Sequence, residues 1–98
     1  MLSHDVKDIQ QLRQIISDTL CHHEQLETGI FPMTERVLQR AGRPCGIFFC
    51  LYGPRQVRST AIWETDTNTI LFYGSNGERI QKMALARGIL AHAPNAEF

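Results

Sequence analysis

The sequence predicts an α+β fold in which a helical layer packs on one face of a small antiparallel sheet. Residues 3–27 carry apolar side chains at helical spacing, whereas residues 45–74 contain three apolar runs separated by turn-forming residues. The helical and strand patterns therefore occupy separate parts of the chain. With 98 residues the chain can build one modest core, so a single domain over residues 1–98 is expected.

Residues 3–27 have the clearest helical pattern, with Ser3 as a candidate N-cap and Thr28-Gly29 as the stop. The expected buried stripe consists of Val6, Ile9, Leu12, Ile15, Ile16, Leu20 and Leu26. A second, shorter helix is expected over residues 32–41, because Pro32 fits a first helical turn and Gly42-Arg43-Pro44 would end it. The two segments together predict an N-terminal helical hairpin packed on the sheet.

Three strands are expected over residues 45–52, 57–64 and 69–73, in a three- or four-stranded antiparallel meander. Two-residue connections at Pro54-Arg55 and Asp66-Thr67 would set their register. One sheet face would then carry four aromatic residues, namely Phe48, Tyr52, Trp63 and Phe72. The first strand is apolar on both faces, so a single helical layer would leave its second face to be covered.

Residues 75–98 allow more than one structure. Asn76-Gly77 is typical of a hairpin and favours a fourth strand over residues 79–83. Ser75 with Glu78 also matches a helical capping box, and the residues that follow are good helix formers. The strand is the preferred interpretation, and a frayed tail is expected from about residue 88.

The net charge is zero, yet the two signs are unevenly distributed. Residues 1–35 hold two cations and six acids, and residues 36–98 hold eight cations and four acids. Between Arg36 and Trp63 there are five arginines and no acid. The simplest explanation is an acidic helix that neutralises a basic sheet; the alternative is a patch that faces an anion.

No motif in the sequence is specific for catalysis, a metal or a cofactor. Successive helical residues point in different directions, so Cys21-His22-His23 cannot close on one ion, and His23 with Glu27 supplies only two ligands. Cys50 lies in the most apolar run, where its thiol is expected to be neutral and inert. We therefore expect no metal or cofactor and disfavour an enzyme.

The chain also lacks an apolar run of the ~20 residues that a membrane span requires. Its N-terminus has neither a basic region nor an apolar region of the kind found in signal peptides. These features favour a cytoplasmic protein without membrane contact, and the three cysteines are then expected to be reduced.

The favoured function is a small intracellular protein–protein interaction or assembly module, homodimeric through its sheet, because the uncovered apolar face requires a partner. The alternative is an anion or single-stranded nucleic-acid binder that uses the Arg36–Arg58 region and the sheet aromatics. The candidate residues for either surface are Phe48, Tyr52, Trp63, Phe72, Arg55 and Arg58. Self-association is preferred because Val57, Ala61 and Ile70 are expected to surround the rings, making that face too apolar for a stacking surface.

Overall fold

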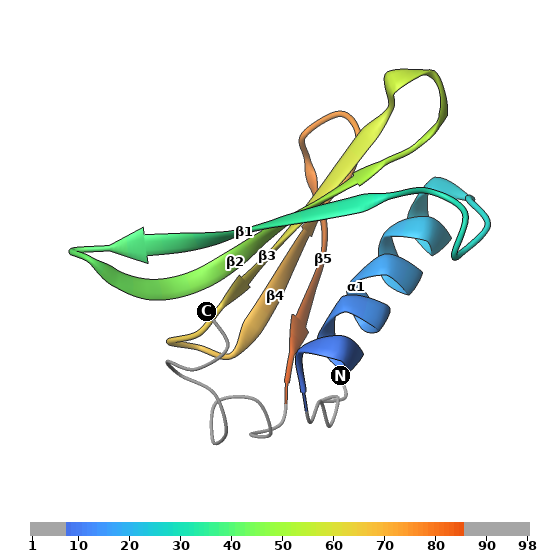
Figure 1. The fold of residues 1–98 in the computed structure, drawn as a ribbon. Coiled ribbons are helices and arrows are strands. Elements are labelled where there is room, and N and C mark those ends of the chain that lie inside the picture. The colour runs from blue at the N-terminus through green and yellow to red at the C-terminus, as the bar shows by residue number, and fades with distance from the viewer. Residues whose placement is uncertain (1–7, 86–98) are drawn as a thin grey trace.

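The computed structural model describes residues 8–85 and contains one helix followed by an antiparallel sheet (Figure 1). The elements are α1 (Ile9–Glu24), β1 (Met33–Arg40), β2 (Arg43–Tyr52), the 3-10 turn η1 (Pro54–Gln56), β3 (Arg58–Glu64), β4 (Thr69–Tyr73) and β5 (Arg79–Ala84). The α+β class is confirmed. The tail expected from about residue 88 lies outside the described residues.

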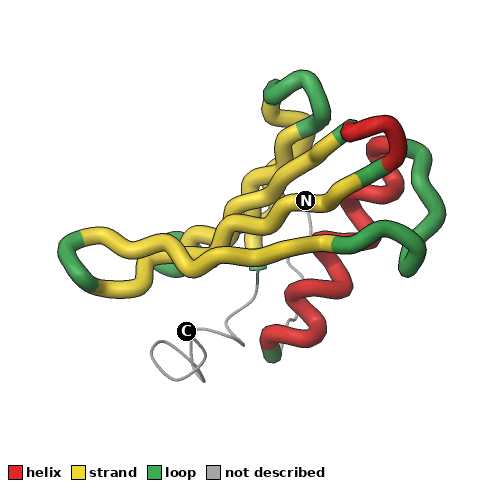
Figure 2. The backbone as a smooth tube through the Cα atoms, turned by 45° about the horizontal axis from the view of Figure 1, so that its top comes forward, coloured by secondary structure: helices red, strands yellow, loops and turns green. Residues whose placement is uncertain are grey.

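The five strands form a meander in the order β1-β2-β3-β4-β5, with every neighbouring pair antiparallel. Helix α1 lies on one face of this twisted sheet, and the tip of the β1–β2 hairpin extends beyond it (Figures 1 and 2). We call the face that contacts α1 the inner face and the opposite one the outer face. The arrangement has two layers, and no described helix covers the outer face.

Helix α1 is shorter than the pattern predicted. Asp8 is its N-cap, with extended backbone and a side chain that accepts a hydrogen bond from the Gln11 amide. The helix ends at Glu24, because Gln25 adopts a left-handed conformation and the Leu26 amide donates to the Cys21 carbonyl. Residues 25–29 are therefore not helical, and Ser3 lies outside the described residues. The expected stripe is nevertheless buried at its centre, through Leu12, Ile16 and Leu20.

The predicted second helix over residues 32–41 is wrong, because most of this segment is strand β1. Its eight residues pair with β2, so the backbone polar groups on that side are satisfied by a neighbouring strand. Ala41 and Gly42 both have positive φ, which is the two-residue hairpin geometry that matches strand twist. Gly42 thus closes a hairpin and does not end a helix.

The predicted register between the first two apolar runs is also wrong. Tyr52 pairs with Arg58, so five residues connect these strands where a two-residue turn was expected. Turn η1 lies within this connection and contains Arg55 with φ 58°. The change shifts the pairing by one residue, which exchanges the faces of one strand relative to the next. Ile47, Phe49 and Leu51 therefore share the inner face with Ser59, Ala61, Trp63, Ile70 and Phe72.

The segment after Asn76-Gly77 is a strand, as the hairpin interpretation predicted. Gly77 has φ 86°, and the Asn76 side chain accepts a hydrogen bond from the Glu78 amide across the turn. Strand β5 follows and pairs with β4. The Glu24 carboxylate accepts from the Ser75 amide, which ties this hairpin to the end of α1.

The core lies between α1 and the inner face, and its largest side chain is Trp63. The indole N–H of Trp63 donates to the Asn68 side-chain oxygen over 3.0 Å, so the buried ring has its polar group satisfied. Asn68 also accepts from the Leu85 amide through its backbone carbonyl. These bonds hold the β3–β4 turn against the chain that follows β5.

Truncation of a side chain should lower the free energy of unfolding by different amounts on the two faces of the sheet. Phe49 is fully buried beneath α1, whereas Ile62 is partly exposed on the outer face. Phe49→Ala should lower the free energy of unfolding by about 3–5 kcal/mol through cavity formation. Ile62→Ala should lower the free energy of unfolding by less than half of that amount. Urea denaturation of both variants measures the difference, and equal losses would show that the outer face is covered as well.

Candidate functional site

The outer face carries the most distinctive group of side chains in the described chain. Cross-strand pairing places Arg36, Phe48, Ile62, Leu71 and Lys82 in one row. The neighbouring row consists of Thr34, Cys50, Thr60, Tyr73 and Arg79, and Tyr52 pairs with Arg58 at the next position of β2 and β3. Aromatic, aliphatic and cationic side chains are thus combined on a surface that no described helix covers.

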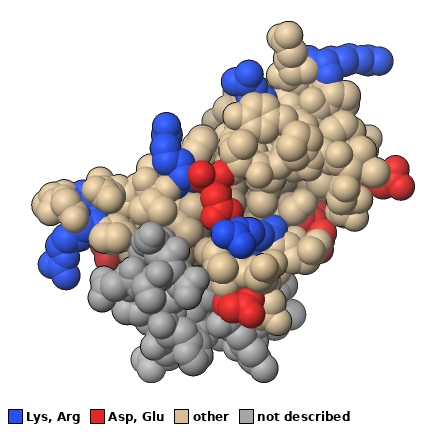
Figure 3. All heavy atoms as spheres, in the orientation of Figure 1, with Lys and Arg blue, Asp and Glu red and all other residues tan. Residues whose placement is uncertain are grey.

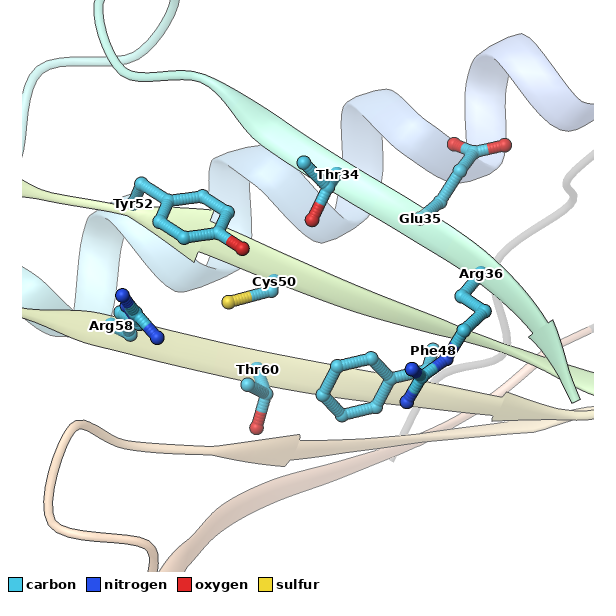
Figure 4. Close-up of a pocket in the computed structure, with 8 residues that line it drawn as sticks. All are labelled: Thr34, Glu35, Arg36, Phe48, Cys50, Tyr52, Arg58 and Thr60. Carbon is cyan, nitrogen blue, oxygen red and sulfur yellow. The ribbon is translucent and has the colours of Figure 1, made fainter.

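A hollow of about 420 Å³ lies on the β1–β2–β3 part of this face (Figure 4). It is lined by Thr34, Glu35, Arg36, Phe48, Cys50, Tyr52, Arg58 and Thr60. Phe48 and Tyr52 lie four positions apart on β2, so their side chains point to the same face with Cys50 between them. The small residues on the neighbouring strands leave space between the two rings.

Each ring at this hollow is paired with an arginine. The Arg36 guanidinium lies over Phe48, 5.6 Å from the ring centroid, and that of Arg58 lies 5.1 Å from the Tyr52 centroid. A guanidinium over the face of a ring is attracted by the charge distribution of the ring, and its N–H groups can still donate to a further partner. The sheet therefore presents two cations beside rings, one at each end of the hollow.

The carboxylate of Glu35 does not neutralise them. It accepts hydrogen bonds from Nε and Nη2 of Arg13 on α1, at 2.7 and 2.8 Å, and Figure 4 shows its side chain directed away from the two rings. This is the one ion pair within residues 8–85, and both partners come from the acidic part of the sequence. The five arginines between Arg36 and Trp63 have no carboxylate partner in the described structure. Direct neutralisation of the sheet by the helix, the simplest explanation of the charge asymmetry, is not observed.

On the side of the molecule seen in Figure 3, basic side chains are dispersed and acidic groups lie between them. The outer face differs from that side. Of the residues that pairing assigns to the outer face, six are cationic and one is acidic, Glu64; the cations are Arg36, Arg40, Arg43, Arg58, Arg79 and Lys82.

Three of the six candidate residues come together at the hollow: Phe48, Tyr52 and Arg58. Trp63 and Phe72 do not, because the corrected register turns them inward, where they are 1% and 0% exposed. Arg55 lies in η1, in the turn that follows β2. The predicted face of four aromatic residues is therefore wrong, and two of those rings belong to the core.

Sequence reasoning missed Thr34, Thr60 and the role of Arg36 as a partner of Phe48. Thr34 and Arg36 could not be placed on the sheet, because residues 32–41 were predicted to form a helix. The alternation of Met33, Glu35 and Val37 with Thr34 and Arg36 is a period of two, and it could have indicated a strand. Lys82 and Arg79 depended on the structure of residues 79–83, which the sequence left open.

Away from the outer face, the thiol of the buried residue Cys21 has a shifted pKa. Burial raises the pKa of the Cys21 thiol, and the nearby Asp18 carboxylate acts in the same direction, while a hydrogen bond with Ser17 opposes both. Within the described part of the chain, no three His, Cys, Asp or Glu side chains gather where they could hold a metal ion. Nor is any helix among residues 8–85 long and apolar enough to cross a membrane.

Comparison of the chain with protein-family models, curated proteins and solved structures finds no match. Any functional conclusion therefore depends on the surface itself.

Trp63 gives a direct test of the assignment of faces. Because its indole is 1% exposed beneath α1, acrylamide should quench its emission far less than that of a free tryptophan analogue. Urea-unfolded protein provides the exposed reference for the same residue. Efficient quenching in the native protein would contradict the inward orientation of this strand face.

Proposed function

We propose that this protein is a binding module whose outer sheet face holds an anionic partner. The observation that carries the proposal is the pair of arginines that lie over Phe48 and Tyr52, without a carboxylate partner among the described residues. Exposed arginines are common, but each of these two lies beside a ring and they flank one hollow. A cation–π contact favours the conformation in which the arginine lies at the hollow, and a cation that is already positioned loses less freedom when it binds.

The surroundings of the two rings also favour an anionic ligand. The preference for self-association rests on Val57, Ala61 and Ile70 surrounding the rings. Ala61 and Ile70 are instead buried beneath α1, on the opposite face of the sheet from Phe48 and Tyr52. The rings have Thr34, Thr60 and two arginines as neighbours at the hollow. Two cations beside two rings suit a charged ligand that also has flat groups.

A short fluorescein-labelled oligothymidine is a suitable anionic probe, and its anisotropy should report saturable binding. The affinity should fall steeply between about 50 and 200 mM salt, since phosphate contacts release counterions. Arg36→Gln and Arg58→Gln should each weaken binding and reduce the slope of log K against log salt by about one.

The matched control is Gln10→Glu, which changes the net charge by the same amount at an exposed position of α1. It should leave the affinity within error of the unmodified protein. Absence of binding at low salt would contradict the proposal, as would equal losses in the Arg36, Arg58 and Gln10 variants.

Self-association through the same face is the second candidate, and it corresponds to the homodimer that the sequence favoured. Leu38, Ile62 and Leu71 support it, because these apolar side chains are only half-buried on the outer face. A symmetric face-to-face contact would nevertheless bring the cations of two copies together, and like charges across an interface are unfavourable.

The two candidates respond to salt in opposite ways. Self-association through a cationic face should be promoted as salt screens the repulsion, whereas anion binding should weaken. Light scattering at micromolar concentration measures the mass over the same salt range. We expect a monomer at low salt. A stable dimer whose mass is unaffected by salt, and which Ile62→Glu dissociates, would reverse the order of the candidates.

A further inference from the structure

We propose that the hollow between Phe48 and Tyr52 receives an unpaired nucleobase, which makes single-stranded nucleic acid the partner of the outer face. This inference rests on the proposed function and specifies its ligand. It follows from the side chains that line the hollow: two aromatic rings, a guanidinium group over each ring, and small side chains between them.

The size of the hollow suits a flat group. Its volume of about 420 Å³ lies within the range of roughly 300–1,000 Å³ that is common for small-molecule sites. Strand geometry separates the Cα atoms of Phe48 and Tyr52 by about 13 Å, since each residue of a strand advances the chain by ~3.3 Å. Thr34, Cys50 and Thr60 lie across the strands between these rings, and none of them is large enough to fill the gap.

The chemistry of the lining matches a nucleotide unit in two separate ways. Bases stack on aromatic rings or on the planes of arginine side chains, and both are present at each end of the hollow. The in-plane N–H groups of Arg36 and Arg58 can then donate to phosphate oxygens. The threonine hydroxyls at the hollow can donate or accept, so they tolerate different base edges.

Other polyanions would use only part of this surface. An acidic peptide would neutralise the arginines but would not supply a flat ring for the space beside Phe48 and Tyr52. A duplex presents phosphates while its bases remain stacked inside the helix. Single strands combine accessible bases with regularly spaced phosphates, and they are therefore the class that uses both the charge and the hollow.

The test compares labelled oligothymidine with an abasic strand of the same length, which has the same phosphates and no bases. The unmodified protein should bind oligothymidine about tenfold or more tightly than the abasic strand, because each stacked base contributes to affinity. The double substitution Phe48→Leu with Tyr52→Leu should remove most of this preference and leave abasic binding nearly unchanged. Tyr73→Leu is the matched control, since Tyr73 lies on the outer face but does not line the hollow.

A second variant makes the test independent of the two rings. Thr34 is exposed on the edge strand β1, so Thr34→Leu should fill part of the hollow without entering the core and without adding a ring on which a base could stack. It keeps both arginines and both rings, and it should lower oligothymidine affinity toward the abasic value. Circular dichroism and thermal unfolding establish that each variant retains the fold.

The outcomes separate this inference from the proposed function. Equal affinity for the two strands would overturn base binding while leaving an anion-binding face. No binding of either strand would overturn both. Displacement of the oligonucleotide by an acidic peptide at lower concentration than by unlabelled strand would also overturn the inference, and would identify a protein as the partner class.

Discussion

Within residues 8–85, the structure depends on one helix that covers one side of a five-stranded sheet. The buried stripe of α1, centred on Leu12, Ile16 and Leu20, packs on an inner face that contains Phe49, Trp63 and Phe72. Because one helix reaches only one face, the sheet has a dry side and a side that no described element covers. Trp63, Phe49 and Phe72 belong to the core, whereas Phe48 and Tyr52 lie on the other side with their arginines.

The sequence predicted those features that local patterns determine. The apolar stripe of the helix, the three central strands and the hairpin at Asn76-Gly77 each depend on residues that are close in the chain. Local patterns could not predict that the connection between β2 and β3 has an odd number of residues. Gly53-Pro54-Arg55-Gln56 is typical of a turn, but its sequence does not reveal that Arg55 and Gln56 both adopt positive φ and enlarge the loop. An error of one residue there was enough to exchange the faces.

Strand β1 shows a different limit of sequence reasoning. Met33, Val37 and Ala41 share a spacing of four, which favours a helix, while Met33, Glu35 and Val37 also fit a strand. Local propensity cannot decide between the two structures. The strand is stabilised by hydrogen-bonded pairing with β2, and the spacing of apolar residues in this segment does not reveal that pairing. This ambiguity affects the candidate site, because a helix over residues 32–41 would not place Thr34 and Arg36 beside Phe48.

The uneven distribution of charge along the chain can be interpreted only once strand β1 and the register between β2 and β3 are known. Four of the six acids in residues 1–35 have partners other than the sheet cations: Asp8 caps α1, Asp18 accepts from Gln14, Glu24 accepts from the Ser75 amide and Glu35 pairs with Arg13. Each of these interactions helps to begin, support or anchor α1. These acidic residues thus stabilise the layer that covers the inner face, and within residues 8–85 the same arrangement leaves Arg36 and Arg58 without a carboxylate partner on the outer face. In this fold, the interactions that hold the helix in place also separate the charges, and that separation is the physical basis of the proposal that the outer face binds an anion.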